Sequence, residues 1–430
     1  MSFPVICSIF SGTFMFVLDR IFLAHYSFDA MNGATFAHQV TDIIVLPLLS
    51  FAAISEVFVG QFNGAQQFKK ASDPIMQIAV FLLLVWLLIC PLALYIRKFF
   101  IPECVWSEGN PYYCISMAMI PFQILQSSIS AFFIGTRRPK IILFGTLTAN
   151  VLNFLMDYLF IFGVGPFAPM GAKGAALASL IATVTSVIIL ATLFFNSYNS
   201  QNYDSRHMSV DFVILKRNIL IGAPYALSEF VEMVVWMVLL LFLKEISMDA
   251  VILQSVGCTL WVFFAFISEG FQKGVMALAS NCLGAGKDIL IRRLVRSMLW
   301  ITCVFAIFSA IPLLMYPELV VRLAFKITEA PLVADFKVLL ALLWASYIIL
   351  LLSHSCLGGI LSSGGDTKFV TYVKMSSVLT CLIIPVCIFY SMKELTALTS
   401  WWLVIFQYIF NGAFFYTRFK KGAWKNVIIN

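Results

Sequence analysis

The stretch ANVLNFLMDYLFIFGVGPFAPMGAKGAALASLIA, residues 149–182, is apolar over most of its length, yet it carries Asn153 and Asp157. Four residues are slightly more than one helical turn, so these two side chains share one face of a helix. A carboxyl group inside a membrane-spanning helix is costly and usually serves a function. The stretch therefore predicts a membrane protein with a polar site among its helices.

The composition of the whole chain agrees with this interpretation. Of the 430 residues, 61% are hydrophobic and only 11% are charged. Soluble globular domains are about one quarter charged. Apolar runs long enough to form membrane-spanning helices recur from one end of the chain to the other, which is typical of a polytopic membrane protein.

We predict an all-α polytopic fold with twelve transmembrane helices. Only a helix or a closed barrel satisfies the backbone inside lipid, and these runs are too long and too uniformly apolar for barrel strands. The predicted spans are 3–25, 36–61, 74–96, 114–135, 141–163, 172–196, 213–243, 248–282, 296–316, 338–362, 369–391 and 398–417.

The basic residues predict the orientation. Seventeen of the 28 Lys and Arg residues lie in the connections after even-numbered spans, in the first residues of the spans that follow them, and in the C-terminal tail. Positive residues stay on the cytoplasmic side, so both termini are expected to be cytoplasmic, in a bacterial inner membrane. The basic residues are scattered over loops and form no continuous patch, so nucleic acid is not an expected partner.

The chain divides into two similar halves. A polar connection at about 197–210 separates six spans from six, which predicts lobes at 1–200 and 201–430 related by a pseudo-twofold axis. Landmarks recur 220 residues apart, at Pro4 and Pro224 and at the Gly-Ala pairs 64–65 and 284–285. Parallel repeats of this kind are a transporter plan, with the substrate route between the halves.

The order of motifs resembles the multidrug and toxic-compound extrusion family over essentially the whole chain. The resemblance rests on the opening stretch and on VLDRIFLA (17–24), GQFNGA (60–65), GAPYALSEFVE (222–232) and NCLGAG (281–286). It implies a secondary transporter with two six-helix lobes.

The resemblance also implies a cation site in the N-terminal lobe, formed by Asp19, Asn153, Asp157 and Ser179. Ser179 stands where the family commonly has Thr, a departure that keeps the hydroxyl oxygen. Na⁺ prefers such oxygen ligands and could bind at Asp19, Asn153 and Asp157. A proton would instead sit on Asp157, because burial penalises the charged carboxylate. A helix-to-helix hydrogen bond without an ion is the plainer alternative.

Arg20 directly follows Asp19. Neighbouring residues point about 100° apart on a helix, so the two side chains do not face each other well. We expect Asp19 to face the lobe interior, and Arg20 to extend toward the interface or toward an acid on another span.

The C-terminal half has a second group of candidates. Glu232 stands where one branch of the family keeps a cation-binding Glu, and Glu229 lies three residues earlier. Leu351 occupies the position of that branch's second acid, which argues against a Na⁺ site here. His354 lies nearby, so Glu229, Glu232 and His354 form a possible substrate or proton site.

Other polar residues in the spans have plainer interpretations. Glu269 and Lys273 are four residues apart, a spacing that favours a salt bridge within one helix. Structural roles are likewise expected for Asp42 and Glu56, and an interfacial position for His38. Cys104 and Cys114 flank one outside loop, where a disulfide would be compatible with an oxidising compartment.

The predicted function is antiport, with export of cationic amphipathic organic compounds in exchange for H⁺ or Na⁺. The alternative is a lipid-linked oligosaccharide flippase, but its diphosphate substrate would require several inward Arg or Lys residues. An enzyme is not expected, because the chain has no H-E-x-x-H motif and no Walker loop. No cofactor is expected, and the predicted state is a monomer in the lipid bilayer.

Overall fold

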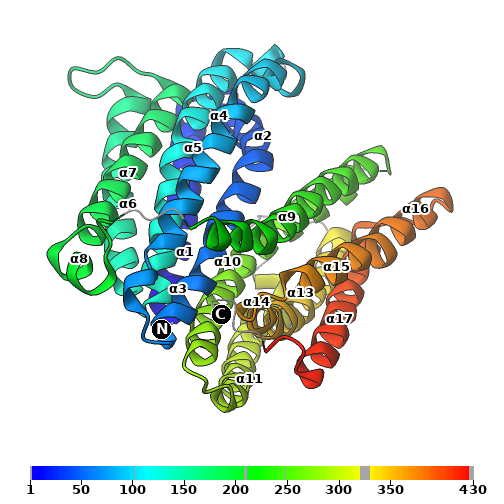
Figure 1. Cartoon of the computed structure of the whole chain (residues 1–430). Coiled ribbons are helices and arrows are strands. Elements are labelled where there is room, and N and C mark those ends of the chain that lie inside the picture. Colours follow the sequence, from blue (N-terminus) through cyan, green and yellow to red (C-terminus); the bar gives the residue numbers. More distant parts are fainter. Residues whose placement is uncertain (1, 102, 208–210, 247, 320–329, 426–430) are drawn as a thin grey trace. The chain divides into compact units, whose positions relative to one another are not determined.

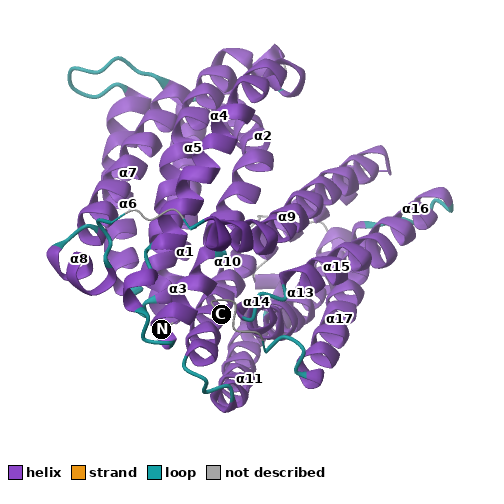
Figure 2. Cartoon of the chain, in the orientation of Figure 1, coloured by secondary structure: helices purple, strands orange, loops and turns teal. Residues whose placement is uncertain are grey.

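The computed structural model describes residues 2–101, 103–207, 211–246, 248–319 and 330–425, and those residues form helices joined by short connections (Figure 2). No strand occurs within these ranges. The predicted all-α fold is therefore confirmed.

The chain forms two compact units, one within residues 1–230 and the other within residues 231–427. The change from one unit to the other falls inside the helix Phe212–Ile246 (α9). The predicted lobe boundary at 200/201 stays a prediction. Each unit is described by itself below.

The first unit contains eight helices before α9 (Figure 1). They are α1 (Ser2–Tyr26), α2 (Phe28–Ala53), α3 (Ser55–Gly64), α4 (Asp73–Phe100), α5 (Trp106–Gly135), α6 (Lys140–Phe162), α7 (Gly171–Phe194) and α8 (Ser197–Tyr203). The predicted span 36–61 is divided between α2 and α3, with a break at Ile54. The predicted connection at 197–210 includes the short helix α8, whose first turn is capped by the side chain of Asn196.

The second unit contains the C-terminal part of α9 and the helices that follow it. They are α10 (Met248–Gly284), α11 (Ile289–Ala310), α13 (Ala330–Leu350), α14 (Gly359–Ser363), α15 (Thr367–Ser377), α16 (Ile384–Ser391) and α17 (Ala397–Lys421). Three π-helical segments extend or join them, at Ile311–Met315, Leu351–Gly358 and Val378–Ile383. Such widened turns are often found at functional sites.

The long helices coincide with the predicted spans. Eleven described helical stretches are long and apolar enough to cross a membrane, and they correspond to the second through twelfth predicted spans. The first predicted span, 3–25, coincides with α1, a helix of 25 residues. Each predicted span therefore has a helical counterpart.

Glycines bring α6 and α7 into close contact. The two helices run side by side and are joined by the loop at the upper left of Figure 1. Gly163 ends α6 with a φ of 72°, a left-handed conformation that favours glycine. A Cβ on Gly174 of α7 would lie 2.8 Å from the backbone carbonyl atoms of Phe160 on α6. The absence of a side chain at Gly174 thus allows this approach.

The first turn of α7 is also tied to α5. The backbone N–H of Ala172 donates to Oε2 of Glu108, at 2.9 Å. A carboxylate at a helix N-terminus satisfies a free N–H group and complements the helix dipole. The contact positions the start of the helix that carries Ser179.

Candidate cation-binding site

Three helices of the first unit bring four polar side chains together. Asp19 lies on α1, Asn153 and Asp157 lie on α6, and Ser179 lies on α7. Their exposed fractions are 5%, 1%, 0% and 6%. A buried group of this polarity must satisfy itself internally or bind a proton or a cation.

The two carboxyl groups lie close together, because one atom of the Asn153 side-chain amide lies 3.1 Å from Oδ1 of Asp19 and 3.0 Å from Oδ2 of Asp157. Two carboxylates this close repel each other, and a proton, a cation or hydrogen-bond donors must compensate their charge. Oδ1 of Asp157 is buried and has no hydrogen-bond partner among the described residues. It is therefore an acceptor available to a cation.

Ser179 links the group across α7. Its hydroxyl donates to Oδ2 of Asp19 at 3.3 Å, and it lies 3.3 Å from the side-chain amide of Asn153. Ser179 thus connects α7 to α1 and lies beside the α6 residues of the group.

The side-chain amide of Asn153 joins the two carboxyl groups. Its nitrogen donates to Asp19 at 3.1 Å and to Asp157 at 3.0 Å, while its oxygen accepts from the backbone N–H of Ser179 at 3.2 Å. The amide therefore compensates part of the charge of the two carboxyl groups.

The donor set fits a hard monovalent cation. The carboxylates, the amide oxygen and the hydroxyl are all oxygen ligands, which Na⁺ prefers. Within the described residues, no three or more His, Cys, Asp and Glu side chains gather as a transition metal would require. Asn153 and Ser179 would thus complete the ligand set that the two carboxyl groups begin.

Arg20 faces away from this group. Its Nη1 and Nη2 donate to the backbone carbonyls of Met31 and Ala34 on α2, at 3.4 and 3.2 Å. Its guanidinium lies over the ring of Tyr112 on α5, 5.7 Å from the centroid. The predicted divergence of Asp19 and Arg20 is present in the structure.

The second unit has its own polar group. Nζ of Lys374 on α15 lies 3.9 Å from Oε2 of Glu232 on α9. The charge of Lys374 also acts on His354, whose Nε2 lies 3.1 Å from the amide nitrogen of Asn411 on α17. Of the three predicted residues here, Glu232 and His354 share Lys374 as a neighbour. Glu229 lies on the part of α9 that belongs to the first unit and is half-buried.

The remaining polar residues have the following surroundings. Nζ of Lys273 lies 2.6 Å from Oε1 of Glu269, so the predicted salt bridge is confirmed. Glu56 is fully buried. Cys104 and Cys114 are free thiols in this structure.

Several residues of these groups are not evident from the sequence. Nothing in the sequence distinguishes Tyr112 and Asn411 from other residues of their spans. Lys374 is recognisable as a charged residue, but the sequence does not indicate its partners. Glu108 gives no sign that it reaches Ala172, 64 residues further along the chain. The signal in the sequence is the presence of Gly33 and Gly109, because glycine allows two helices to approach closely. In the structure, a Cβ on Gly33 would lie 2.8 Å from the backbone nitrogen of Gly109.

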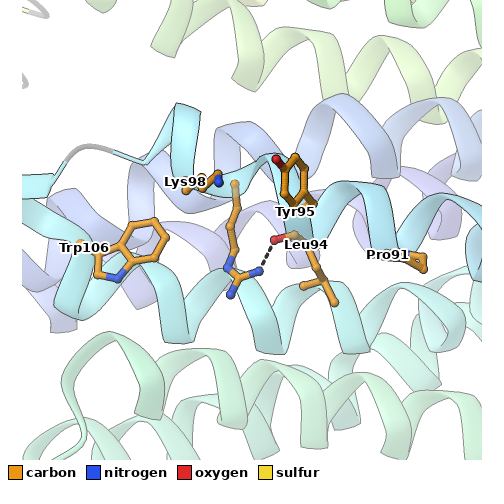
Figure 3. Close-up of a pocket in the computed structure, with 6 residues that line it drawn as sticks. Pro91, Leu94, Tyr95, Lys98 and Trp106 are labelled. Carbon is orange, nitrogen blue, oxygen red and sulfur yellow. Dashed lines mark hydrogen bonds between the residues drawn. The ribbon is translucent and has the colours of Figure 1, made fainter.

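A surface hollow of about 440 Å³ lies elsewhere in the first unit, at the end of α4 and the start of α5 (Figure 3). Its lining includes Lys98, Tyr95 and Trp106, with the Lys98 ammonium 4.6 Å from the centre of the Tyr95 ring. Aromatic and basic side chains at a helix end are typical of a membrane–water interface. The hollow contains none of the four buried site residues.

Comparison with known proteins identifies relatives of the whole chain. The family model described as MatE matches residues 4–159 and 224–388. A probable multidrug resistance protein NorM from Thermotoga maritima is 22% identical over 418 residues, which cover 95% of this chain and 88% of that protein. An FAD transporter from Shewanella oneidensis is 24% identical, over 82% of this chain and 76% of its own length.

Solved structures show the same fold. A crystal structure of a eukaryotic MATE transporter matches with a TM-score of 0.82 at 18% identity, over 100% of this chain and 96% of that chain. An outward-facing multidrug resistance MATE transporter matches with a TM-score of 0.82 at 15% identity, over 99% and 95%. The two-lobed, twelve-helix fold is thus common to these proteins and to this chain.

Proposed function

Because the chain belongs to the MatE family, a family of multi-pass membrane transporters, we propose that it is a secondary active antiporter that exports organic compounds in exchange for H⁺ or Na⁺. The observation that carries this proposal is the buried group of Asp19, Asn153, Asp157 and Ser179 in the first unit. Two carboxyl groups, an amide and a hydroxyl together suit a small cation, and no plainer structural need explains a close pair of buried acids.

In this account, Na⁺ or a proton binds the same carboxyl oxygens. The two ions therefore compete for Asp19 and Asp157. Because the ligands come from α1, α6 and α7, the occupied site favours the arrangement of these helices in which all the ligands meet. A cation can drive transport only through such unequal binding to two arrangements.

We expect the substrates to be cationic and amphipathic. The spans carry more acidic than basic side chains, and aromatic residues offer cation–π contacts. The FAD transporter among the relatives introduces an anionic alternative, because that protein is named for a phosphate-containing substrate. The two substrate classes can be compared directly in one assay.

The flippase alternative is not favoured. A diphosphate would need several available basic side chains. Lys273 lies against Glu269, Lys374 lies against Glu232, and Arg20 donates to two backbone carbonyls. These partners lower the ability of the three cations to bind a phosphate group.

The remaining parts of the proposal follow the charge distribution. With most loop cations after even-numbered spans, both termini would be cytoplasmic and the protein would lie in a bacterial inner membrane. A single chain carries both polar groups, so the proposed functional state is a monomer.

The test is uptake of a fluorescent organic cation into vesicles that contain the purified protein with its cytoplasmic face outward. A Na⁺ gradient and a pH gradient are imposed separately, and empty vesicles are the control. Uptake driven by one gradient supports antiport and identifies the ion. If neither gradient drives uptake of the cation, and a flavin dinucleotide is taken up instead, the cationic substrate class is wrong. If neither compound is taken up, the antiport proposal loses its support.

A further inference from the structure

A second titratable pair lies on α2 of the first unit. Nε2 of His38 is 3.5 Å from Oδ2 of Asp42, one helical turn later, and the two side chains are 35% and 25% exposed. Both residues lie within the membrane-spanning stretch Phe28–Gly64. Ionisable side chains in such a stretch are rare unless they serve a function.

Arg20 supplies a fixed positive charge beside this pair. Its guanidinium is anchored to α2 by the carbonyls of Met31 and Ala34, and its charge acts on both His38 and Asp42. A guanidinium stays protonated in proteins. Because the two carbonyls hold Arg20, neutralising Asp42 would not leave the guanidinium without hydrogen-bond partners.

The other elements packed on α2 contribute less charge. Tyr112 of α5 interacts electrostatically with Asp42 and also with Asp19 and Asp157. Helices α4 and α7 also contact α2. Arg20 acts electrostatically on both His38 and Asp42, and Tyr112 acts on Asp42 and on the two acids of the Asp19 group.

The exposed side of α2 beside the pair is mixed in polarity. Asn32 and Gln39 are exposed and seven residues apart, so they share one side of the helix. That side also carries the exposed rings of Phe28 and Phe36. A side-chain amide exposed to hydrocarbon would lose its hydrogen bonds at a high free-energy cost. Water that solvates these two amides would supply the proton to the pair.

We propose that Asp42 and His38 form a second proton-binding site, separate from the Asp19–Asp157 group. A proton from water at Asn32 and Gln39 binds the Asp42 carboxylate. The resulting O–H donates to Nε2 of neutral His38, and no covalent bond other than the O–H changes. His38 thereby both receives this hydrogen bond and connects Asp42 to the exposed face.

The site has a consequence for the cation group. When Asp42 is neutral, the charge of Arg20 is less compensated, and Arg20 is adjacent to Asp19 on α1. A cation at Asp19 and Asp157 is then bound more weakly, and by thermodynamic linkage that cation weakens proton binding at Asp42. This consequence rests on the proposed cation site, whereas the proton site itself does not.

Infrared difference spectroscopy of the purified full-length protein, between about pH 8 and about pH 5, tests the proton site. A carboxylic-acid C=O band should appear at low pH in the wild type and be lost in Asp42→Asn. Asp29→Asn, in the exposed first turn of the same helix, is the matched control and should keep the band. His38→Gln should keep the band at a shifted frequency, because the hydrogen-bond acceptor changes.

Arg20→Gln tests the electrostatic part of the proposal. Removing the positive charge favours protonation, so the midpoint of the band should move to higher pH. An Asp42→Asn spectrum identical to the wild type would overturn the proton site. An unchanged midpoint in a folded Arg20→Gln protein would overturn the role of Arg20.

A separate binding experiment tests the coupling. At about pH 8, Asp42→Asn, which mimics the neutral carboxyl, should bind Na⁺ about fivefold more weakly than the wild type. Equal affinities would overturn the coupling. Absence of Na⁺ binding in the wild type would contradict a Na⁺ site at Asp19 and Asp157, while the infrared result would still decide the proton site.

Discussion

The hydroxyl of Ser179 on α7 donates to the carboxylate of Asp19 on α1, with 3.3 Å between Oγ and Oδ2. The two residues are 160 positions apart in the chain. The contact joins α1 to α7 directly beside Asn153 and Asp157, which lie on α6. It therefore connects the three helices whose arrangement the cation is proposed to control.

Replacing this hydroxyl should weaken cation binding. Ser179→Ala removes the donor to Asp19 and the neighbour of the Asn153 amide, and a hydrogen bond to a charged group contributes about 1.5–3 kcal/mol. We expect the affinity for the coupling cation to fall about tenfold. Ser179→Thr keeps the hydroxyl and is the control, so it should bind like the wild type. Equal cation affinity of the Ala variant, measured by titration of the purified protein, would exclude Ser179 as a ligand or a support.

Gly174→Ala should disturb the packing of α7 on α6. The new Cβ would lie 2.8 Å from backbone atoms of Phe160, which cannot move without displacing α6. Overpacking of this kind costs about 1–3 kcal/mol. Gly145→Ala is the matched control on the same interface, because its Cβ would meet Leu190 at an ordinary 3.5 Å. In detergent, the melting temperature should fall for Gly174→Ala and stay at the wild-type value for Gly145→Ala. Equal melting temperatures of the two variants would contradict the close approach of α7 to α6.

The Glu232–Lys374 pair should contribute to the stability of the second unit. Lys374 has a side-chain exposure of only 9%, so Glu232→Gln leaves a nearly buried ammonium without this acid. We expect Glu232→Gln to lower the free energy of unfolding by about 1–3 kcal/mol. This cost lies between that of breaking an exposed salt bridge and that of breaking a buried one. The double variant Glu232→Gln/Lys374→Gln should be more stable than the sum of the two single effects predicts.

The comparison for this double-mutant cycle is the pair of Glu269 and Lys273. These side chains are more exposed, at 44% and 25%, and lie on one helix. Their coupling energy should be no more than about 1 kcal/mol. If the effects of Glu232→Gln and Lys374→Gln on the free energy of unfolding add up to the effect of the double variant without any difference, the 3.9 Å contact contributes nothing to stability.

The sequence predicts the spans well because helix-length apolar runs leave few alternatives in lipid. Asn153 and Asp157 were identified from their spacing on one helix, which is local information. Asp19 and Ser179 are distant in the chain, so only the resemblance to a known family suggested that they join the same group. Their meeting depends on α6–α7 packing at Gly174 and on the contact of Glu108 with α7.

Other features could not be predicted, for physical reasons. The π-helical segment that contains His354 has the same apolar pattern as an α-helix, so periodicity does not reveal it. His38 was predicted to be interfacial, and its relation to Arg20 becomes visible only once Arg20 is found on the carbonyls of Met31 and Ala34. Long-range polar contacts of this kind leave no regular spacing in the sequence.

The central claim is that Asp157 holds the coupling cation, and gradient-driven transport by Asp157→Asn tests it most directly. Two assays are run on the same vesicles: accumulation of the organic cation driven by a Na⁺ or pH gradient, and exchange of that compound without any gradient. The account predicts that Asp157→Asn loses accumulation but keeps exchange, while Asp29→Asn keeps both. Wild-type accumulation by a folded Asp157→Asn protein would show that the coupling cation binds elsewhere.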